Sequence, residues 1–220
     1  MTGRLRSSRH RARKGEGALL REEILDVTED LLYRHGSMDA VSIRAIASRV
    51  GVTPPALYLH FEDKDQLFYA VCHRGFDRFA AHLAPVLASS GSAVERIRRL
   101  GEEYVRFGLE NRQQYPILFG AHKVPIPEEQ IADDPGLRIL EGLVALVEEA
   151  QASGDLRADI AAATVAALLW ASVHGLVELL LLTNDNPALI RIPPAEDLTR
   201  PLIDTVLAGL AIVPKTVEAL

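Results

Sequence analysis

The feature that most constrains this chain is the stretch from Val41 to Phe61, in which two short helices must meet at a tight turn. Ser42 can cap the start of the first helix, and Gly51 can adopt the left-handed conformation that ends it. Apolar residues recur at i, i+3, i+4 and i+7 and give this helix one face to bury: Ile43, Ile46, Ala47 and Val50.

The second helix begins after Thr53, whose hydroxyl is a natural N-cap, and Pro54 stands where a missing N–H costs nothing. Leu57 and Phe61 lie one turn apart and are expected to face inward. The outward side then carries Pro55, Ala56, Tyr58, Leu59 and His60. Two helices held at a fixed angle in this way are typical of a DNA-reading helix-turn-helix.

The same residues resemble the TetR family of repressors over roughly the first third of the chain. The likeness rests on Ser42-x-Arg44-x-Ile46-Ala47, then Gly51-Val52-Thr53, then Tyr58-x-His60-Phe61-x-x-Lys64-x-x-Leu67. It implies that the second helix of the motif enters the major groove. It also implies that four side chains hold phosphates: Thr53, Tyr58, His60 and Lys64.

Base recognition needs side chains that reach base edges, and the outward face from Thr53 to His60 contains no Arg, Lys, Asn or Gln. We therefore expect Arg44, on the first helix of the motif, to read a base directly, plausibly a guanine. Apolar side chains of the second helix would contact thymine methyls. The predicted DNA-binding set is Ser42, Arg44, Thr53, Pro55, Ala56, Tyr58, Leu59, His60 and Lys64.

Charge is distributed unevenly along the chain, whose formal net charge is −6. Residues 1–65 carry 11 Lys and Arg and 10 Asp and Glu, whereas the remainder carries 13 basic and 20 acidic residues. Six basic side chains precede the first acidic one, Glu16. This opening tail suits an A·T-rich minor groove or phosphates. A disordered solubilising tail is an equal alternative.

The 220 residues suffice for a small domain and a larger one, and the pattern predicts an all-α fold. We expect a basic arm over residues 1–17, the helix-turn-helix domain over 18–65, and a helical effector-binding and dimerisation domain over 66–220. A helix over about 18–35 would brace the reading pair. A long helix over about 63–88 would link the two domains as a lever.

The C-terminal part carries a second resemblance, to the WHG-type C-terminal domain of a subset of TetR regulators. It rests on Trp170-x-x-x-His174-Gly175, with Tyr115 and Phe119, whereas Arg112 stands where that pattern often has a proline. Trp170, His174 and Glu178 share one helical face, so Glu178 could accept a hydrogen bond from His174. The alternative is a structural role, in which His174 makes its hydrogen bonds within a helix–helix interface.

A regulator needs two states that a ligand can bias, so we expect a small-molecule effector in the C-terminal core. The effector should be apolar or weakly polar, because few charges lie on the inward faces. Plain core packing is the alternative role of its candidate contacts. These are Tyr104, Phe107, Tyr115, Phe119, His122, Trp170 and His174.

A single helix-turn-helix reads a short half-site, so we expect a homodimer on a near-palindromic double-stranded operator, formed by the last two helices. The apolar region 160–182 is interrupted by polar residues and predicts a buried or dimer-forming helix rather than a membrane span. The histidines are scattered and show no metal-ligand spacing, so we expect neither an enzyme nor a cofactor or metal site. The lone Cys72 favours the cytoplasm. A constitutive or architectural DNA-binding protein without effector is the alternative function.

Overall fold

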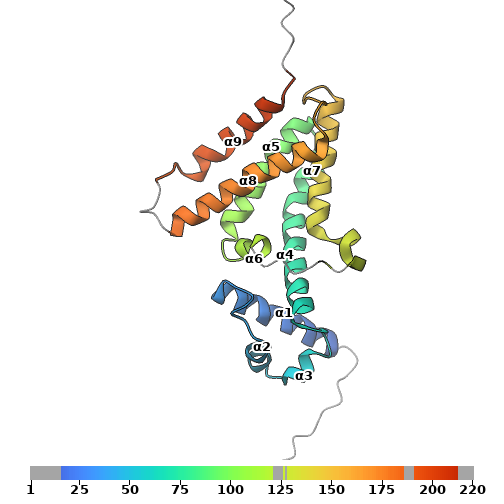
Figure 1. Cartoon of the computed structure of the whole chain (residues 1–220), viewed down its shortest axis with the longest axis vertical. Helices are drawn as coiled ribbons and strands as arrows, with labels where there is room; N and C mark the ends of the chain where they lie inside the picture. Colours follow the sequence, from blue (N-terminus) through green and yellow to red (C-terminus); the bar gives the residue numbers. More distant parts are fainter. Residues whose placement is uncertain (1–15, 121–125, 127, 186–190, 213–220) are drawn as a thin grey trace, which may run out of the picture. The chain divides into compact units, whose positions relative to one another are not determined.

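The computed structural model describes residues 16–120, 126, 128–185 and 191–212, and these form helices joined by turns (Figure 1). Within these ranges the one strand-like pairing is a single antiparallel bridge between Leu156 and Ala211. The predicted all-α fold is confirmed. The helices are α1 Glu16–His35, α2 Ile43–Val50, α3 Pro54–Leu57, α4 Lys64–Leu87, α5 Ala93–Glu110, α6 Tyr115–Phe119, the 3-10 helix η1 Glu128–Asp133, α7 Pro135–Ala152, α8 Ala162–Asp185 and α9 Ala195–Leu210.

The chain forms two compact units that divide within α4, between Cys72 and His73. The N-terminal unit holds α1 to α3 and the start of α4. The C-terminal unit holds the rest of α4 and the helices from α5 onward. The predicted basic arm lies outside the described residues, apart from its last two positions.

The core of the N-terminal unit is built on the inward face of α1. Ile24 and Leu32 are fully buried, and Thr28 is buried between them. The Thr28 hydroxyl donates to the Ile24 carbonyl oxygen at 2.6 Å, which satisfies the hydroxyl inside the core. α1 therefore presents a well-packed face, and α2 packs against α1.

The C-terminal unit is centred on α5, α7 and α8, which pack against one another, while α9 packs on α5 and α8 (Figure 1). α5 lies close to α8 at Gly108, where an added Cβ would lie 2.6 Å from Val177 Cγ1. A glycine is needed there, since any side chain would force the helices apart. Val147 and Val165 are fully buried in the same core.

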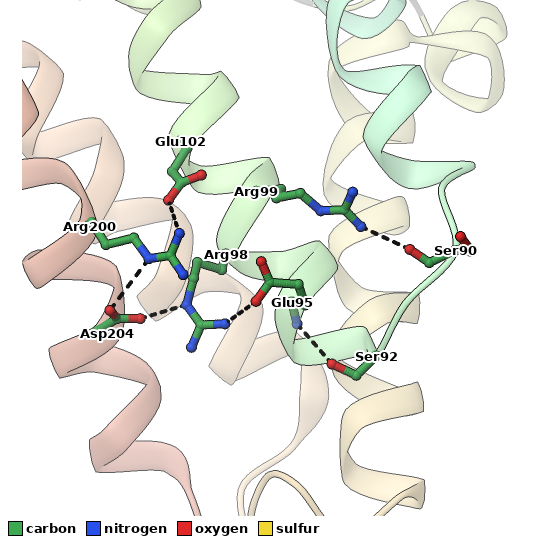
Figure 2. Close-up of polar contacts among 8 residues, drawn as sticks. All are labelled: Ser90, Ser92, Glu95, Arg98, Arg99, Glu102, Arg200 and Asp204. Atoms are coloured by element: carbon green, nitrogen blue, oxygen red, sulfur yellow. Dashed lines mark hydrogen bonds and ion pairs between the residues drawn. The ribbon is translucent and has the colours of Figure 1, made fainter.

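Ion pairs join the outer faces of α5 and α9 (Figure 2). Arg98 Nε lies 2.6 Å from Asp204 Oδ1, and the other branch of Arg98 reaches Glu95 Oε2 at 2.6 Å. Arg200 pairs with Glu102 at 3.0 Å and lies 3.6 Å from Asp204. Because these side chains are partly exposed, water and salt screen them, so they contribute to the placement of α9 more than to stability.

α8 is the one described helix that is long and apolar enough to cross a membrane by length and composition. Val165, Leu169, Val173 and Val177 are buried against the other helices of the C-terminal unit. This burial is typical of the central helix of a helical core.

Candidate functional site

The first helix of the predicted DNA-reading motif, α2, begins after Ser42 and ends before Gly51, as the sequence predicted. The Ser42 hydroxyl accepts from the Ala45 N–H at 3.1 Å and caps α2. Gly51 lies in the left-handed region at φ 81° and ψ 25°, and its N–H donates to the Ala47 carbonyl oxygen at 3.0 Å. A side chain would be strained at this φ, so Gly51 fixes the turn between α2 and α3.

The second helix is shorter than the sequence indicated, since α3 ends at Leu57 and residues 58–60 form turns. Thr53 occupies the N-cap position with extended backbone, but its side chain makes no capping hydrogen bond. The Thr53 hydroxyl is therefore left for another acceptor, which fits its predicted phosphate contact. Leu57 and Phe61 are buried, as predicted.

The outward face of the motif is largely apolar. Leu59 is 84% exposed and Tyr58 is 50% exposed, while Pro55 is also exposed. Ala56 and His60 are only partly exposed. A face of this kind can contact thymine methyls but offers few hydrogen-bond donors to base edges.

Two arginines on α2 have different surroundings. Arg49 forms an ion pair with Asp30 of α1 at 2.8 Å, and Asp30 also binds Arg34 at 3.0 Å. Arg44 is exposed and makes no ion pair or hydrogen bond with the part of the chain that the structure describes. Arg49 thus braces α2 on α1, whereas Arg44 remains available to a partner. The sequence alone does not indicate this role of Arg49, because its partner Asp30 lies on another helix.

Lys64, the first residue of α4, is partly exposed, and its ammonium lies 5.0 Å from the ring centroid of Phe68. This cation–π contact directs the side chain along α4. The guanidinium of Arg21 lies at the same distance over the ring of Phe61. Cationic side chains therefore flank the turn after α3, where the TetR resemblance implies phosphate contacts.

In the C-terminal unit most of the predicted effector contacts gather in one aromatic cluster. The Phe79 ring centroid lies 4.6 Å from that of Phe107 and 5.2 Å from that of Tyr104. Phe119 lies 4.6 Å from Tyr115. Phe79 and Phe76 come from α4 and were not among the predicted contacts. The cluster joins α4, α5, α6 and α8.

A chain of hydrogen bonds runs through this cluster. The Tyr104 hydroxyl lies 3.0 Å from the Tyr115 hydroxyl and 3.0 Å from His174 Nδ1. The Tyr115 hydroxyl lies 2.5 Å from the same nitrogen. Trp170 Nε1 donates to the Tyr104 oxygen at 3.1 Å. We call these four residues the polar relay.

The predicted hydrogen bond from His174 to Glu178 is absent among the described contacts, and His174 Nδ1 instead lies within hydrogen-bonding distance of two tyrosine hydroxyls. Glu178 acts on the relay only through its charge. Both tyrosines belong to the predicted set, but the sequence could not show that they converge on one nitrogen. His122, also predicted, lies outside the described residues.

Burial sets the protonation of the relay. It raises the pKa of Tyr104 to about 12 and also raises the pKa of Tyr115, so both hydroxyls keep their protons near neutral pH. Burial lowers the pKa of His174, and the charge of Glu178 partly opposes this shift. The imidazole is therefore neutral near pH 7.

Comparison with known families decides the class of this protein. The family model described as "Bacterial regulatory proteins, tetR family" matches residues 24–71, and "Tetracyclin repressor-like, C-terminal domain" matches residues 97–206. The chain belongs to the TetR family. TetR proteins are regulators and not enzymes, in agreement with the sequence prediction.

Several curated TetR relatives are regulators. Mycolicibacterium smegmatis FasR, named a transcriptional activator, is 30% identical over 47% of this chain and 45% of its own length. Escherichia coli ComR, a repressor, is 36% identical over 34% of this chain and 35% of its own length. The chain thus spans less than half of either relative. Brucella suis BepR, a repressor, is 27% identical over 75% of this chain and 82% of its own length.

Solved structures share the fold of this TetR chain. A Rhodococcus sp. RHA1 protein of unknown function has a TM-score of 0.72 and 27% identity, over 94% of this chain and all of the other. Bacillus subtilis FadR in complex with stearoyl-CoA has a TM-score of 0.69 and 12% identity, over 86% and 98%. AibR in complex with isovaleryl coenzyme A and operator DNA has a TM-score of 0.62 and 19% identity, over 87% and 98%.

Proposed function

We propose that this TetR chain is a cytoplasmic transcriptional repressor that binds a near-palindromic operator as a homodimer and is released by a small molecule. One observation carries the proposal: the capped turn joins α2, on which Arg44 is exposed, to α3, which is followed by the exposed Tyr58 and Leu59. Such a surface suits DNA, since a guanidinium can bind guanine edges while apolar groups contact thymine methyls.

Phosphate contacts would place this surface on the groove. Thr53 has an uncommitted hydroxyl at the start of α3, and Lys64 carries its ammonium at the start of α4. Phosphate contacts position a protein on DNA without selecting a sequence. We therefore assign specificity to Arg44 and the apolar face, and uniform affinity to Thr53, Tyr58, His60 and Lys64.

Dimerisation is proposed through α8 and α9. Leu168 and Leu182 of α8 are each 49% exposed, and Ile212, which follows α9, is also exposed. Gly175 and Gly209 have open space around an added Cβ within the described part of one protomer. Apolar faces with small residues allow two copies to approach closely, which would bury these leucines in a four-helix interface.

The effector is proposed to bind at the aromatic cluster, where an apolar or weakly polar molecule would find Phe119, Tyr104 and Trp170. Two proteins of the same fold, FadR and AibR, are known in complex with acyl-CoA compounds, which supports an acyl-bearing effector. We assign a WHG-type C-terminal domain on Trp170, His174 and Gly175. ComR and BepR, both named repressors, support repression over activation.

The experiment that tests this function is selection of bound duplexes from random DNA by the purified protein at two salt concentrations. An operator-reading dimer should enrich a near-palindrome whose two half-sites are separated by about one helical turn, roughly 34 Å. Binding that depends on salt without any enriched sequence would instead indicate phosphate clamping alone. That result would favour a constitutive architectural protein.

A further inference from the structure

The polar relay has a fixed direction because its donors and acceptors can be matched in only a few ways. The Trp170 N–H donates to the Tyr104 oxygen. The two tyrosine hydroxyls then donate to each other or to His174 Nδ1, which has a single lone pair. Every relay proton has an acceptor only when Nδ1 carries no hydrogen. The imidazole is then neutral, with its proton on Nε2.

A second proton on His174 would disturb this match. Nδ1–H would have to donate to a tyrosine oxygen, and one hydroxyl hydrogen would lose its acceptor inside the cluster. Tyr115 is fully buried and Tyr104 is 5% exposed, so water cannot easily replace that acceptor. Among the described residues, Glu178 on the same helix is the charged group that acts on His174, while α5 and α6 present Tyr104 and Tyr115 to the ring and Phe119 completes the contact.

The other nitrogen of the ring is committed to nothing in the described residues. His174 is only partly buried, and Trp170, one helical turn before it, is 40% exposed. The α8 side of the relay is therefore accessible to solvent, whereas the two tyrosines are buried. His174 Nε2–H is thus a donor of fixed orientation at the edge of an aromatic cluster. Two aromatic rings lie near the imidazole: the centroid of the His174 ring is 5.1 Å from that of Phe119 and 5.8 Å from that of Trp170.

From this geometry we propose that His174 selects the effector by donating from Nε2–H to an uncharged carbonyl oxygen, so that the effector is an acyl compound such as an ester, thioester or amide. The aromatic cluster holds the acyl chain, and the relay keeps the donor in its tautomer. The inference rests on the proposed effector site and adds the polar group that this site recognises. A molecule of the same shape without a carbonyl would leave the donor unpaired.

Two substitutions separate the two nitrogens of His174. His174→Asn places an amide at the position of Nδ1, which can still accept from Tyr115, but it removes the donor at Nε2. His174→Gln places its amide N–H₂ near Nε2 and restores a donor. The pair therefore distinguishes loss of the donor from loss of the relay.

Binding can be followed by the fluorescence of Trp170, the only tryptophan of the chain. The probes are saturated methyl esters of six to sixteen carbons and their methyl ether analogues of matched length, titrated into full-length protein. We expect the wild-type protein to bind the best ester about fivefold more tightly than its ether, which is the usual gain from one hydrogen bond. His174→Asn should abolish this preference, and His174→Gln should restore part of it.

Equal affinity of the wild-type protein for ester and ether would overturn the inference and leave the effector site itself standing. If no probe binds, the acyl class is wrong, while operator binding is still decided by the duplex selection. If His174→Asn keeps the ester preference but weakens the dimer, the donor serves a subunit contact and the inference is overturned. As a ligand-free check, ¹⁵N NMR should show His174 protonated at Nε2 and bare at Nδ1, and the opposite tautomer would also overturn it.

Discussion

The contact of α5 with α8 at Gly108 yields a prediction whose size follows from the structure. In Gly108→Ala the new Cβ would lie 2.6 Å from Val177 Cγ1, 3.1 Å from Val177 Cγ2 and 3.2 Å from Tyr115 Cδ2. Val177 is β-branched and lies in a helix, so it cannot rotate away from the contact. The helices must separate, or the relay tyrosine must shift.

Overpacking of this kind costs about 3 kcal/mol at the upper end of its range. Alanine regains about 1 kcal/mol through its better helix propensity. The net destabilisation is about 2 kcal/mol. For a chain of this size it corresponds to a fall in melting temperature of roughly 4–8 °C, measured at fixed protein concentration.

A double-mutant cycle makes the test specific. Val177→Ala alone should cost about 2 kcal/mol, because it removes two buried methyl groups. Combined with Gly108→Ala, it makes room for the new Cβ, so the double variant should be about 2 kcal/mol more stable than the sum of the single changes predicts. Val147→Ala on α7, also fully buried, is the matched control and should add to Gly108→Ala without coupling. Additivity of Gly108→Ala with Val177→Ala would refute the close approach of α5 and α8.

Three further predictions concern the DNA-binding surface and the ion pairs of α9. Arg44→Ala should relax the preference among selected duplexes at a cost of roughly 1–3 kcal/mol, whereas Lys64→Ala should weaken binding to all sequences alike; both are measured by titration of duplex panels. Ser42→Ala removes the hydroxyl that caps α2 and should lower the free energy of unfolding by about 1 kcal/mol in chemical denaturation, with Ser48→Ala as the exposed control in the same helix. The hydrogen bond from Arg98 lowers the pKa of Asp204 below its usual 3.8, so its stabilising contribution is present above that value and is lost as the pH falls below it; Asp204→Asn should flatten this loss in pH-dependent melting.

The helix-turn-helix could be predicted from the sequence because its determinants are local. Ser42 and Gly51 act within one turn of their own positions, and both have the predicted roles. The apolar spacing likewise predicted the burial of Leu57 and Phe61. The length of the second helix was predicted wrongly, since α3 ends at Leu57 and residues 58–60 form turns.

The polar relay could not be predicted in the same way, because Trp170 and His174 on α8 lie far along the chain from Tyr104 and Tyr115 on α5 and α6. Helical spacing placed Glu178 on the same face as His174 and favoured a hydrogen bond between them. The structure instead directs His174 Nδ1 to Tyr104 and Tyr115, which α5 and α6 supply. Residue types identified the candidates, but only tertiary packing decides which donor meets which acceptor.

The role of Arg49 illustrates the same limit. Arg44 and Arg49 both stand on α2, and composition alone does not separate them. Asp30 of α1 binds Arg49 and leaves Arg44 exposed, which is the distinction on which the proposed base contact depends.

The most direct test of the account is a titration of the selected duplex, followed by sedimentation, beside a duplex of equal length in which one half-site is scrambled. A dimer that reads two half-sites should place two protomers on the intact duplex and lose most of its affinity for the scrambled one. Equal affinity for both duplexes, or one protomer per intact duplex, would contradict the account.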